Sequence, residues 1–167
     1  MSTKYPQFNN SALSNLPLVS HCQRNLHSSG VLGLYFSAHW CAPCRAFTPR
    51  LSDFVAKYRE TKVDDPANPK PAFDVIFVSS DDNAEQFDKY HQEEMNFPAV
   101  TFNFERGNDL RQTLAKAFDV QSLPTLIIVD VETGRVIDRR GRDTIMSQSH
   151  KSALDIVNRW NGDRLLN

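Results

Sequence analysis

The sequence has little cysteine, no excess of either charge and no long hydrophobic run. Its three cysteines among 167 residues are odd in number and too few for a secreted scaffold held together by disulfides. The formal net charge is −1, so nothing draws the chain as a whole to nucleic acid or to an acidic membrane surface. The longest apolar runs match one buried strand and fall far short of the roughly 20 residues that span a bilayer. We therefore expect neither a nucleic-acid partner nor a membrane.

The amino-terminal segment lacks the charged and then apolar order of a secretory signal. Residues 1–15 are polar and rich in Asn and Ser, which predicts a flexible segment. Residues 16–167 are enough to bury one good core and are predicted to form a single domain. Together with the scarce cysteine, these features favour a reducing compartment, the cytoplasm or the nucleus.

Apolar residues follow strand and helix periods in alternation along the chain. The predicted strands are 16–19, 31–36, 73–78, 99–102, 125–129 and 135–139. The predicted helices are 20–26, one from the Cys41 region through Tyr58, about 84–95, one capped by Asn108 or Asp109, and 153–160. Alternating strands and helices followed by a hairpin predict an α/β three-layer sandwich, with a mixed central β-sheet and helices on both faces.

The clearest chemical signal is Cys41-Ala42-Pro43-Cys44, which lies where a predicted buried strand turns into a helix. Free N–H groups and the dipole of a helix N-terminus stabilise a thiolate, and the first thiol of such a motif has its pKa lowered by roughly one to several units. The thiolate attacks a disulfide sulfur, and the spacing puts the second thiol within reach of the mixed disulfide that results. Pro43 restricts the turn and has no N–H to donate. The motif therefore predicts a dithiol cycle.

Three other interpretations of this pair stay open. It can be half of a zinc site, although no second pair stands at zinc spacing, His39 is only two residues from Cys41, and Cys22 stands alone. It can also be a static structural disulfide, or two incidental buried cysteines. No metal, nucleotide or flavin motif is visible, and no Gly-rich loop follows the first long strand. We therefore expect no metal and no cofactor, with electrons arriving from another thiol.

Residues 32–45 (LGLYFSAHWCAPCR) resemble the thioredoxin superfamily, and within it the tryparedoxin and nucleoredoxin branch. The resemblance covers about residues 31–142, and its other matching segments are Phe47-Thr48-Pro49, Phe77-Val78-Ser79 and Leu123-Pro124-Thr125-Leu126. It implies a thioredoxin-like fold for residues 16–167. It also implies a thiol–disulfide oxidoreductase, a protein-disulfide reductase of cell redox homeostasis.

The resemblance assigns roles to single residues. Cys41 is implied to be the nucleophile and Cys44 the resolving cysteine. Pro124 is implied to be a cis-proline that faces the disulfide and aims the Leu123 backbone at a bound peptide strand. The alternative for Pro124 is an ordinary loop proline before a strand.

Further residues are implied to bind substrates. Trp40 and Pro43 would border the docking surface for disulfide-containing proteins, while the alternative for Trp40 is a core aromatic. Arg140 and Arg142 take the place of a basic pair that faces the carboxylates of a reducing thiol, and their alternative is a solvated basic edge. The electron donor is then a glutathione-type thiol or a reductase.

The sequence departs from the branch at several positions. Ala42 replaces a proline that the branch usually has, and Tyr35 stands where thioredoxins proper bury an acid. Proton transfer for Cys44 must then use water or another group, for which Asp81 and Asp82 are candidates. The alternative for both carboxylates is helix capping.

Other departures bear on specificity. Ser80 replaces a tryptophan that tryparedoxins usually carry, and His39 matches nucleoredoxins. Some nucleoredoxin relatives hold signalling partners, so the alternative function is a redox-sensitive partner-binding module with little turnover. Cys22 is expected to be a free, partly buried thiol.

Overall fold

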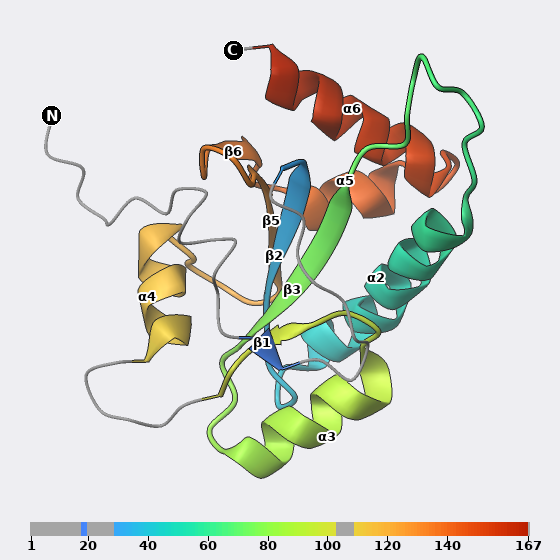
Figure 1. The fold of residues 1–167 in the computed structure, drawn as a ribbon. Coiled ribbons are helices and arrows are strands. Elements are labelled where there is room, and N and C mark those ends of the chain that lie inside the picture. Colours follow the sequence, from blue (N-terminus) through green and yellow to red (C-terminus); the bar gives the residue numbers. More distant parts are fainter. Residues whose placement is uncertain (1–17, 20–28, 103–108, 167) are drawn as a thin grey trace, which may run out of the picture.

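A six-stranded mixed sheet forms the middle of the molecule (Figure 1). The computed structural model describes residues 18–19, 29–102 and 109–166. The strands are β1 (Leu18–Val19), β2 (Val31–Ser37), β3 (Phe73–Ser79), β4 (Ala99–Val100), β5 (Thr125–Asp130) and β6 (Val136–Asp138), in the order β1-β4-β3-β2-β5-β6. β2 pairs parallel with β3 and antiparallel with β5. The strand that leads into the cysteine motif is therefore supported on both sides.

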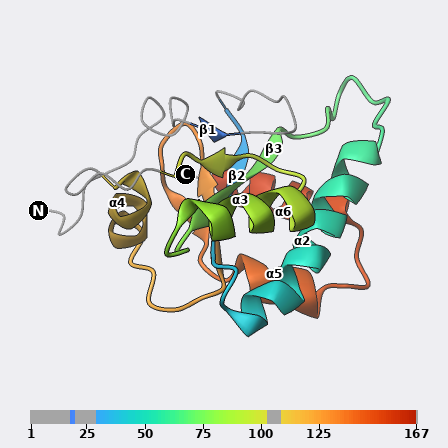
Figure 2. The ribbon, with the colours of Figure 1, turned by 90° about the horizontal axis from the view of Figure 1, so that it is seen from below.

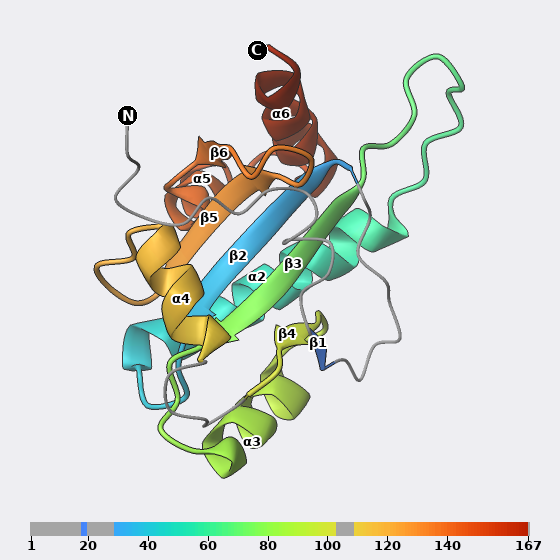
Figure 3. The same cartoon turned by 60° about the vertical axis from the view of Figure 1, so that its left-hand side comes forward.

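Helices cover both faces of this sheet. The described helices are α2 (Ala42–Glu60), α3 (Ala84–Glu94), α4 (Leu110–Ala117), α5 (Gly141–Ser147) and α6 (Ala153–Leu165). α2, α3, α5 and α6 share one hydrophobic cluster with one face of the sheet, and α4 packs with a second cluster on the other face. Figure 3 shows α4 on the opposite side of the sheet from α2. Seen from below, α3 lies beside α2 (Figure 2).

Alternation along β2 explains these two clusters. Val31 and Tyr35 point into the first cluster, whereas Leu32, Leu34 and Phe36 point into the second. Because successive side chains of a strand leave opposite faces of the sheet, a strand covered on both faces reads as a continuous apolar run. The predicted three-layer sandwich with a mixed sheet is confirmed.

The structure also corrects the predicted elements. It adds α5, which has seven residues and is too short to show a helical period. Asn83 caps α3, and Asp109 caps α4. The described β4 is only Ala99–Val100 rather than 99–102. None of the described helices is both long and apolar enough to cross a membrane.

Part of the amino-terminal prediction lies outside the described residues. β1 contains the last two residues of the strand predicted over 16–19, and it pairs antiparallel with β4. The flexible segment 1–15, the helix predicted over 20–26 and Cys22 are not among the described residues. The single domain over 16–167 stays a prediction.

Candidate active site

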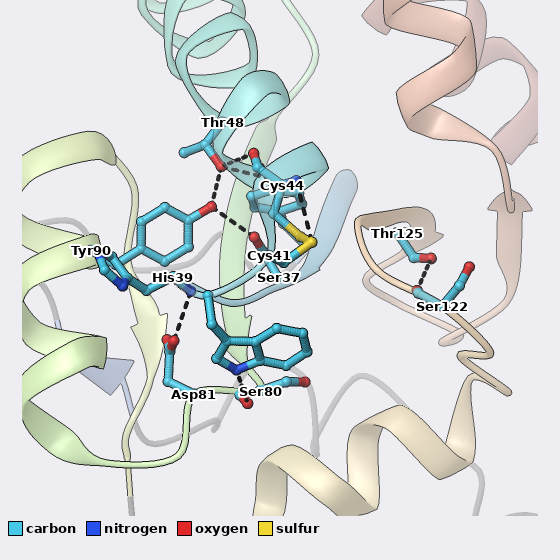
Figure 4. Close-up of a disulfide and its surroundings, with 12 residues drawn as sticks. Ser37, His39, Cys41, Cys44, Thr48, Ser80, Asp81, Tyr90, Ser122 and Thr125 are labelled. Atoms are coloured by element: carbon cyan, nitrogen blue, oxygen red, sulfur yellow. Dashed lines mark hydrogen bonds between the residues drawn. A yellow bond between two sulfur atoms is a disulfide. The ribbon is translucent and has the colours of Figure 1, made fainter.

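The cysteine pair lies where β2 ends and α2 begins (Figure 4). Cys41 and Cys44 form a disulfide, with their Cα atoms 5.2 Å apart. Cys41 is the N-cap residue of α2, and its Sγ accepts a hydrogen bond from the backbone N–H of Cys44 at 3.3 Å. The first turn of α2 carries no acidic residue. The helix terminus would therefore stabilise a thiolate on Cys41 with no opposing carboxylate in that turn.

The two sulfur-bearing residues differ in their access to solvent. Cys41 is 8% exposed and Cys44 is 0% exposed. Both pack against Ala38, and Leu123 lies against the same small cluster. The difference in solvent exposure therefore favours Cys41 as the cysteine that reacts with a substrate first, while Cys44 is buried.

The loop before β5 brings a second predicted segment to the disulfide. The Leu123–Pro124 peptide bond is cis, and Pro124 is buried. Thr125, which begins β5, pairs with Phe36 near the end of β2, and its Oγ1 donates to the Ser122 carbonyl at 2.7 Å (Figure 4). The sheet therefore places Leu123 next to the cysteines although the two segments are far apart in the sequence.

Trp40 lies on the surface beside the cysteines and is not a core aromatic. Its side chain is 56% exposed, and its indole N–H donates to the Ser80 carbonyl at 3.2 Å. Ala42 and Pro43 are exposed as well. Exposed apolar residues therefore flank Cys41 on both sides along the chain.

The carboxylates considered for proton transfer have different surroundings. Asp81 is buried, and one carboxylate oxygen accepts from the His39 backbone N–H at 2.7 Å (Figure 4). Its other oxygen accepts from Ser79 Oγ at 2.7 Å. Asp82 is exposed. Since Asn83 caps α3, the capping interpretation of both carboxylates is wrong, and Asp81 instead holds the loop before Cys41.

The structure separates the two arginines predicted to act as a pair. Arg140 is exposed and forms an ion pair with Asp143 at 2.7 Å, beside a hollow near Trp160. The Arg142 guanidinium lies 5.8 Å from the centre of the Phe47 ring, on the buried face of α2. Arg142 is therefore the one of the two that lies toward the cysteine helix.

A group of buried hydroxyls lies behind Cys44, and the sequence did not predict it. This hydroxyl cluster consists of Tyr35, Ser37, Thr48 and Tyr90. Tyr35 OH lies 2.7 Å from Thr48 Oγ1, Tyr90 OH also bonds Thr48 Oγ1, and Ser37 Oγ lies 2.8 Å from Tyr90 OH. Thr48 Oγ1 donates to the Cys44 carbonyl at 2.9 Å. In the sequence, Tyr35 stands out as a replaced acid, whereas Ser37 and Thr48 belong to matching segments without an expected role, and Tyr90 carries no signal.

Two hydroxyls of the hydroxyl cluster reach the Cys44 carbonyl. Thr48 Oγ1 donates to it at 2.9 Å and Tyr35 OH at 3.4 Å. In the hydrogen bonds between two hydroxyls, either oxygen can be the donor. Burial raises the pKa of Tyr35, with a smaller contribution from Tyr90, and burial likewise raises the pKa of Tyr90. The cluster therefore stays neutral across physiological pH and offers no carboxylate behind Cys44.

These raised pKa values predict a loss of stability in alkali. Below about pH 10 the tyrosines are protonated in both folded and unfolded chains, so they add no pH dependence. Above about pH 10 the unfolded chain ionises first, and the free energy of unfolding falls by about 1.4 kcal/mol per pH unit for each buried tyrosine. Urea unfolding between pH 8 and 11 measures this slope. Tyr35→Phe should reduce this slope by the contribution of one tyrosine, and an unchanged slope would contradict the prediction.

No group of metal ligands occurs within the described ranges. Among residues 18–19, 29–102 and 109–166, no three His, Cys, Asp or Glu side chains gather as they would around a metal ion. His39 instead points its ring at the Tyr90 ring, with 5.9 Å between their centres. Cys22, the other ligand considered for a zinc site, lies outside these ranges.

Comparison with known proteins gives matches at several levels. A family model described as thioredoxin-like matches residues 29–136. Tryparedoxin of Trypanosoma brucei brucei is 34% identical over 113 residues, which cover 68% of this chain and 69% of that protein. Nucleoredoxin of Mus musculus is 36% identical over 135 residues, which cover 78% of this chain and 28% of that protein. A structure of tryparedoxin II complexed with glutathionylspermidine matches with a TM-score of 0.61 and 33% identity, over 72% of this chain and 75% of that one. The chain thus spans less than a third of the nucleoredoxins that it matches.

Proposed function

We propose that this chain, which belongs to the thioredoxin-like family, is a thiol–disulfide oxidoreductase that reduces disulfides through Cys41 and Cys44. The fold and the branch expected from the sequence are confirmed by the matches to tryparedoxins and nucleoredoxins. The single observation that carries the proposal is a disulfide at the N-terminus of α2 with one accessible and one buried cysteine.

The proposed reductive half-reaction uses two thiol exchanges. In the reduced chain the Cys41 thiolate attacks a substrate sulfur, which forms a mixed disulfide and releases one substrate thiolate. Cys44 loses its proton and attacks Cys41 Sγ, which releases the second substrate thiolate and closes the disulfide seen here. Two electrons pass from the cysteines to the substrate. A released thiolate or water takes the Cys44 proton, and Asp81 and Asp82 remain the proposed carboxylates for relaying it.

The proposed oxidative half-reaction returns the electrons from another thiol. Two donor thiols reduce the Cys41–Cys44 disulfide and leave as a donor disulfide, so no cofactor is needed. The matching tryparedoxin II structure contains glutathionylspermidine, which supports a glutathione-type thiol as the donor. Arg142 would meet the carboxylates of such a thiol, whereas Arg140 already pairs with Asp143. A reductase is the other donor class.

The surface around Cys41 suits an extended segment of a protein substrate. Trp40 and Pro43 border the accessible sulfur from the loop and the helix. Leu123 packs against the cysteine pair from the loop before β5, and we propose that Leu123 and the cis Pro124 present backbone groups to the segment. We propose protein disulfides as the main substrates and the cytoplasm or the nucleus as the compartment.

Insulin-disulfide reduction tests this function. The native chain is compared with a double variant in which Cys41 and Cys44 are serine, first with dithiothreitol and then with glutathione as donor. We expect turnover only in the native chain. An inactive native chain with an intact fold would reject the reductase and favour the redox-sensitive binding module, for which partner capture by oxidised and reduced chains is the next measurement.

A further inference from the structure

Arg111 is a buried cation on α4 whose contacts have no role in the thiol exchange itself. Its side chain is 7% exposed, and its Nε and Nη2 bond the two carboxylate oxygens of Asp109 at 3.1 and 2.9 Å. Its Nη1 donates to the carbonyls of Ser79 and Asp81 at 3.1 and 3.3 Å, and its Cζ lies 3.9 Å from the centre of the Phe102 ring. The guanidinium therefore ties the start of α4 to the end of β3.

The two carbonyls that Arg111 binds flank the residues that hold the cysteine loop. We call residues 79–81 the β3-end segment and residues 37–40 the redox loop. The Ser80 N–H donates to the Ser37 carbonyl at 2.9 Å, and the Ser80 carbonyl accepts from the Trp40 indole at 3.2 Å. The Asp81 carboxylate accepts from the His39 N–H at 2.7 Å. Three hydrogen bonds therefore fasten the redox loop to the β3-end segment.

We propose that Arg111 is a positioning residue for disulfide reduction, which acts through the β3-end segment to hold Trp40 and the redox loop in place for a protein substrate. This inference rests on the proposed reductase function. Arg111 touches neither cysteine, so its effect must pass through Ser80 and Asp81. Arg111 lies on α4, on the face of the sheet opposite α2. The residue that positions the redox loop is therefore not part of the helix that carries the cysteines.

Arginine suits this position because of its planar fork. One guanidinium edge takes the Asp109 carboxylate while the remaining nitrogen reaches two backbone carbonyls, and the flat face lies on an aromatic ring. A lysine ammonium would keep the charge beside Asp109 but not this simultaneous geometry. Loss of the fork would free the β3-end segment to shift, and a shift of the docking surface would act on substrates that touch Trp40.

The test uses a double variant that combines Arg111→Met with Asp109→Asn, so that no buried carboxylate is left unpaired. Asn at 109 still accepts hydrogen bonds as an N-cap. The matched control is Arg164→Met made together with Asp130→Asn, since Arg164 is another largely buried arginine and Asp130 is its buried carboxylate partner at the far end of β5. Each chain is assayed with insulin and with a small aromatic disulfide. Iodide quenching of tryptophan fluorescence reports Trp40, because Trp160 is only 1% exposed.

We expect the double variant to raise KM for insulin about five- to tenfold, with kcat and the rate on the small disulfide within about twofold of the native values. Iodide should quench its Trp40 more strongly, and the control with Arg164→Met and Asp130→Asn should change neither readout. If the double variant does not fold, Arg111→Lys is measured with the same expectations. Native KM and native quenching in the folded variant would overturn the proposal. A native chain without turnover would reject the reductase instead, and Trp40 quenching alone would then decide the role of Arg111.

Discussion

Replacing Cys44 by serine should stop the proposed cycle at the mixed disulfide. Cys41 keeps its place at the N-terminus of α2, so the first attack remains fast, while the serine hydroxyl cannot displace the substrate thiol. Replacing Cys41 leaves Cys44 alone, and that residue is 0% exposed, so even the first attack should be slow. We expect each single serine variant to lose insulin turnover by about a thousandfold or more under glutathione, because the two thiols act as a unit.

Single-turnover stoichiometry separates these two variants. All chains carry Cys22→Ser, so that the remaining cysteine outside the motif does not react. The reduced chain with both Cys41 and Cys44 should release two equivalents of the coloured thiolate from an aromatic disulfide, and Cys44→Ser should release one and keep the other bound. Cys41→Ser should release little on the same timescale. Two equivalents from Cys44→Ser would contradict resolution by Cys44, and rapid release by Cys41→Ser would contradict attack by Cys41.

Thr48→Val should lower the free energy of unfolding by about 2–4 kcal/mol. Valine has nearly the same shape as threonine but offers no hydrogen bond. The hydroxyls of Tyr35 and Tyr90 would lose the hydrogen-bond partner that they share, and the Cys44 carbonyl would keep Tyr35 but lose Thr48 as a side-chain donor. These groups are buried, so water does not replace the lost partner without a rearrangement of the core.

Thr48→Ser is the matched control because it keeps the hydroxyl and removes only a methyl group. It should cost about 1 kcal/mol, the value for one buried methyl group. Urea unfolding of the oxidised chains, with the cysteine disulfide intact, measures both variants against the native protein. If valine and serine at this position gave the same free energy of unfolding, the hydroxyl cluster would not contribute as argued.

The fold was largely readable from local patterns. β2 and β3 are continuous apolar runs, and α2 shows a clear helical period from Phe47 to Tyr58, so their types and approximate bounds were predicted. α5 was missed, because seven residues do not make a recognisable period. The cysteine motif was equally local, since its chemistry depends on a spacing of three residues at a strand-to-helix junction.

The partners of the polar residues around the cysteines could not be predicted from the sequence. Asp81 and Asp82 looked alike in the sequence, yet only Asp81 is buried and holds the His39 backbone. Arg140 and Arg142 looked like a pair, yet each has a different partner. Short polar residues and arginines carry no periodic signal of their own, so their partners depend on how the elements pack.

Local sequence is enough to predict the alternating α/β framework, the thioredoxin-like resemblance and the two cysteines, because hydrophobic periodicity and motif spacing are properties of neighbouring residues. The side chains behind and beside these cysteines come together only through the packing of distant elements. Thr48 and Tyr90 are 42 residues apart, and Ser37 and Tyr90 are 53 apart. Arg111 reaches Ser79 across 32 residues. Such hydrogen bonds form only after helices have packed on both faces of the sheet, because burial is what makes each polar group require a partner.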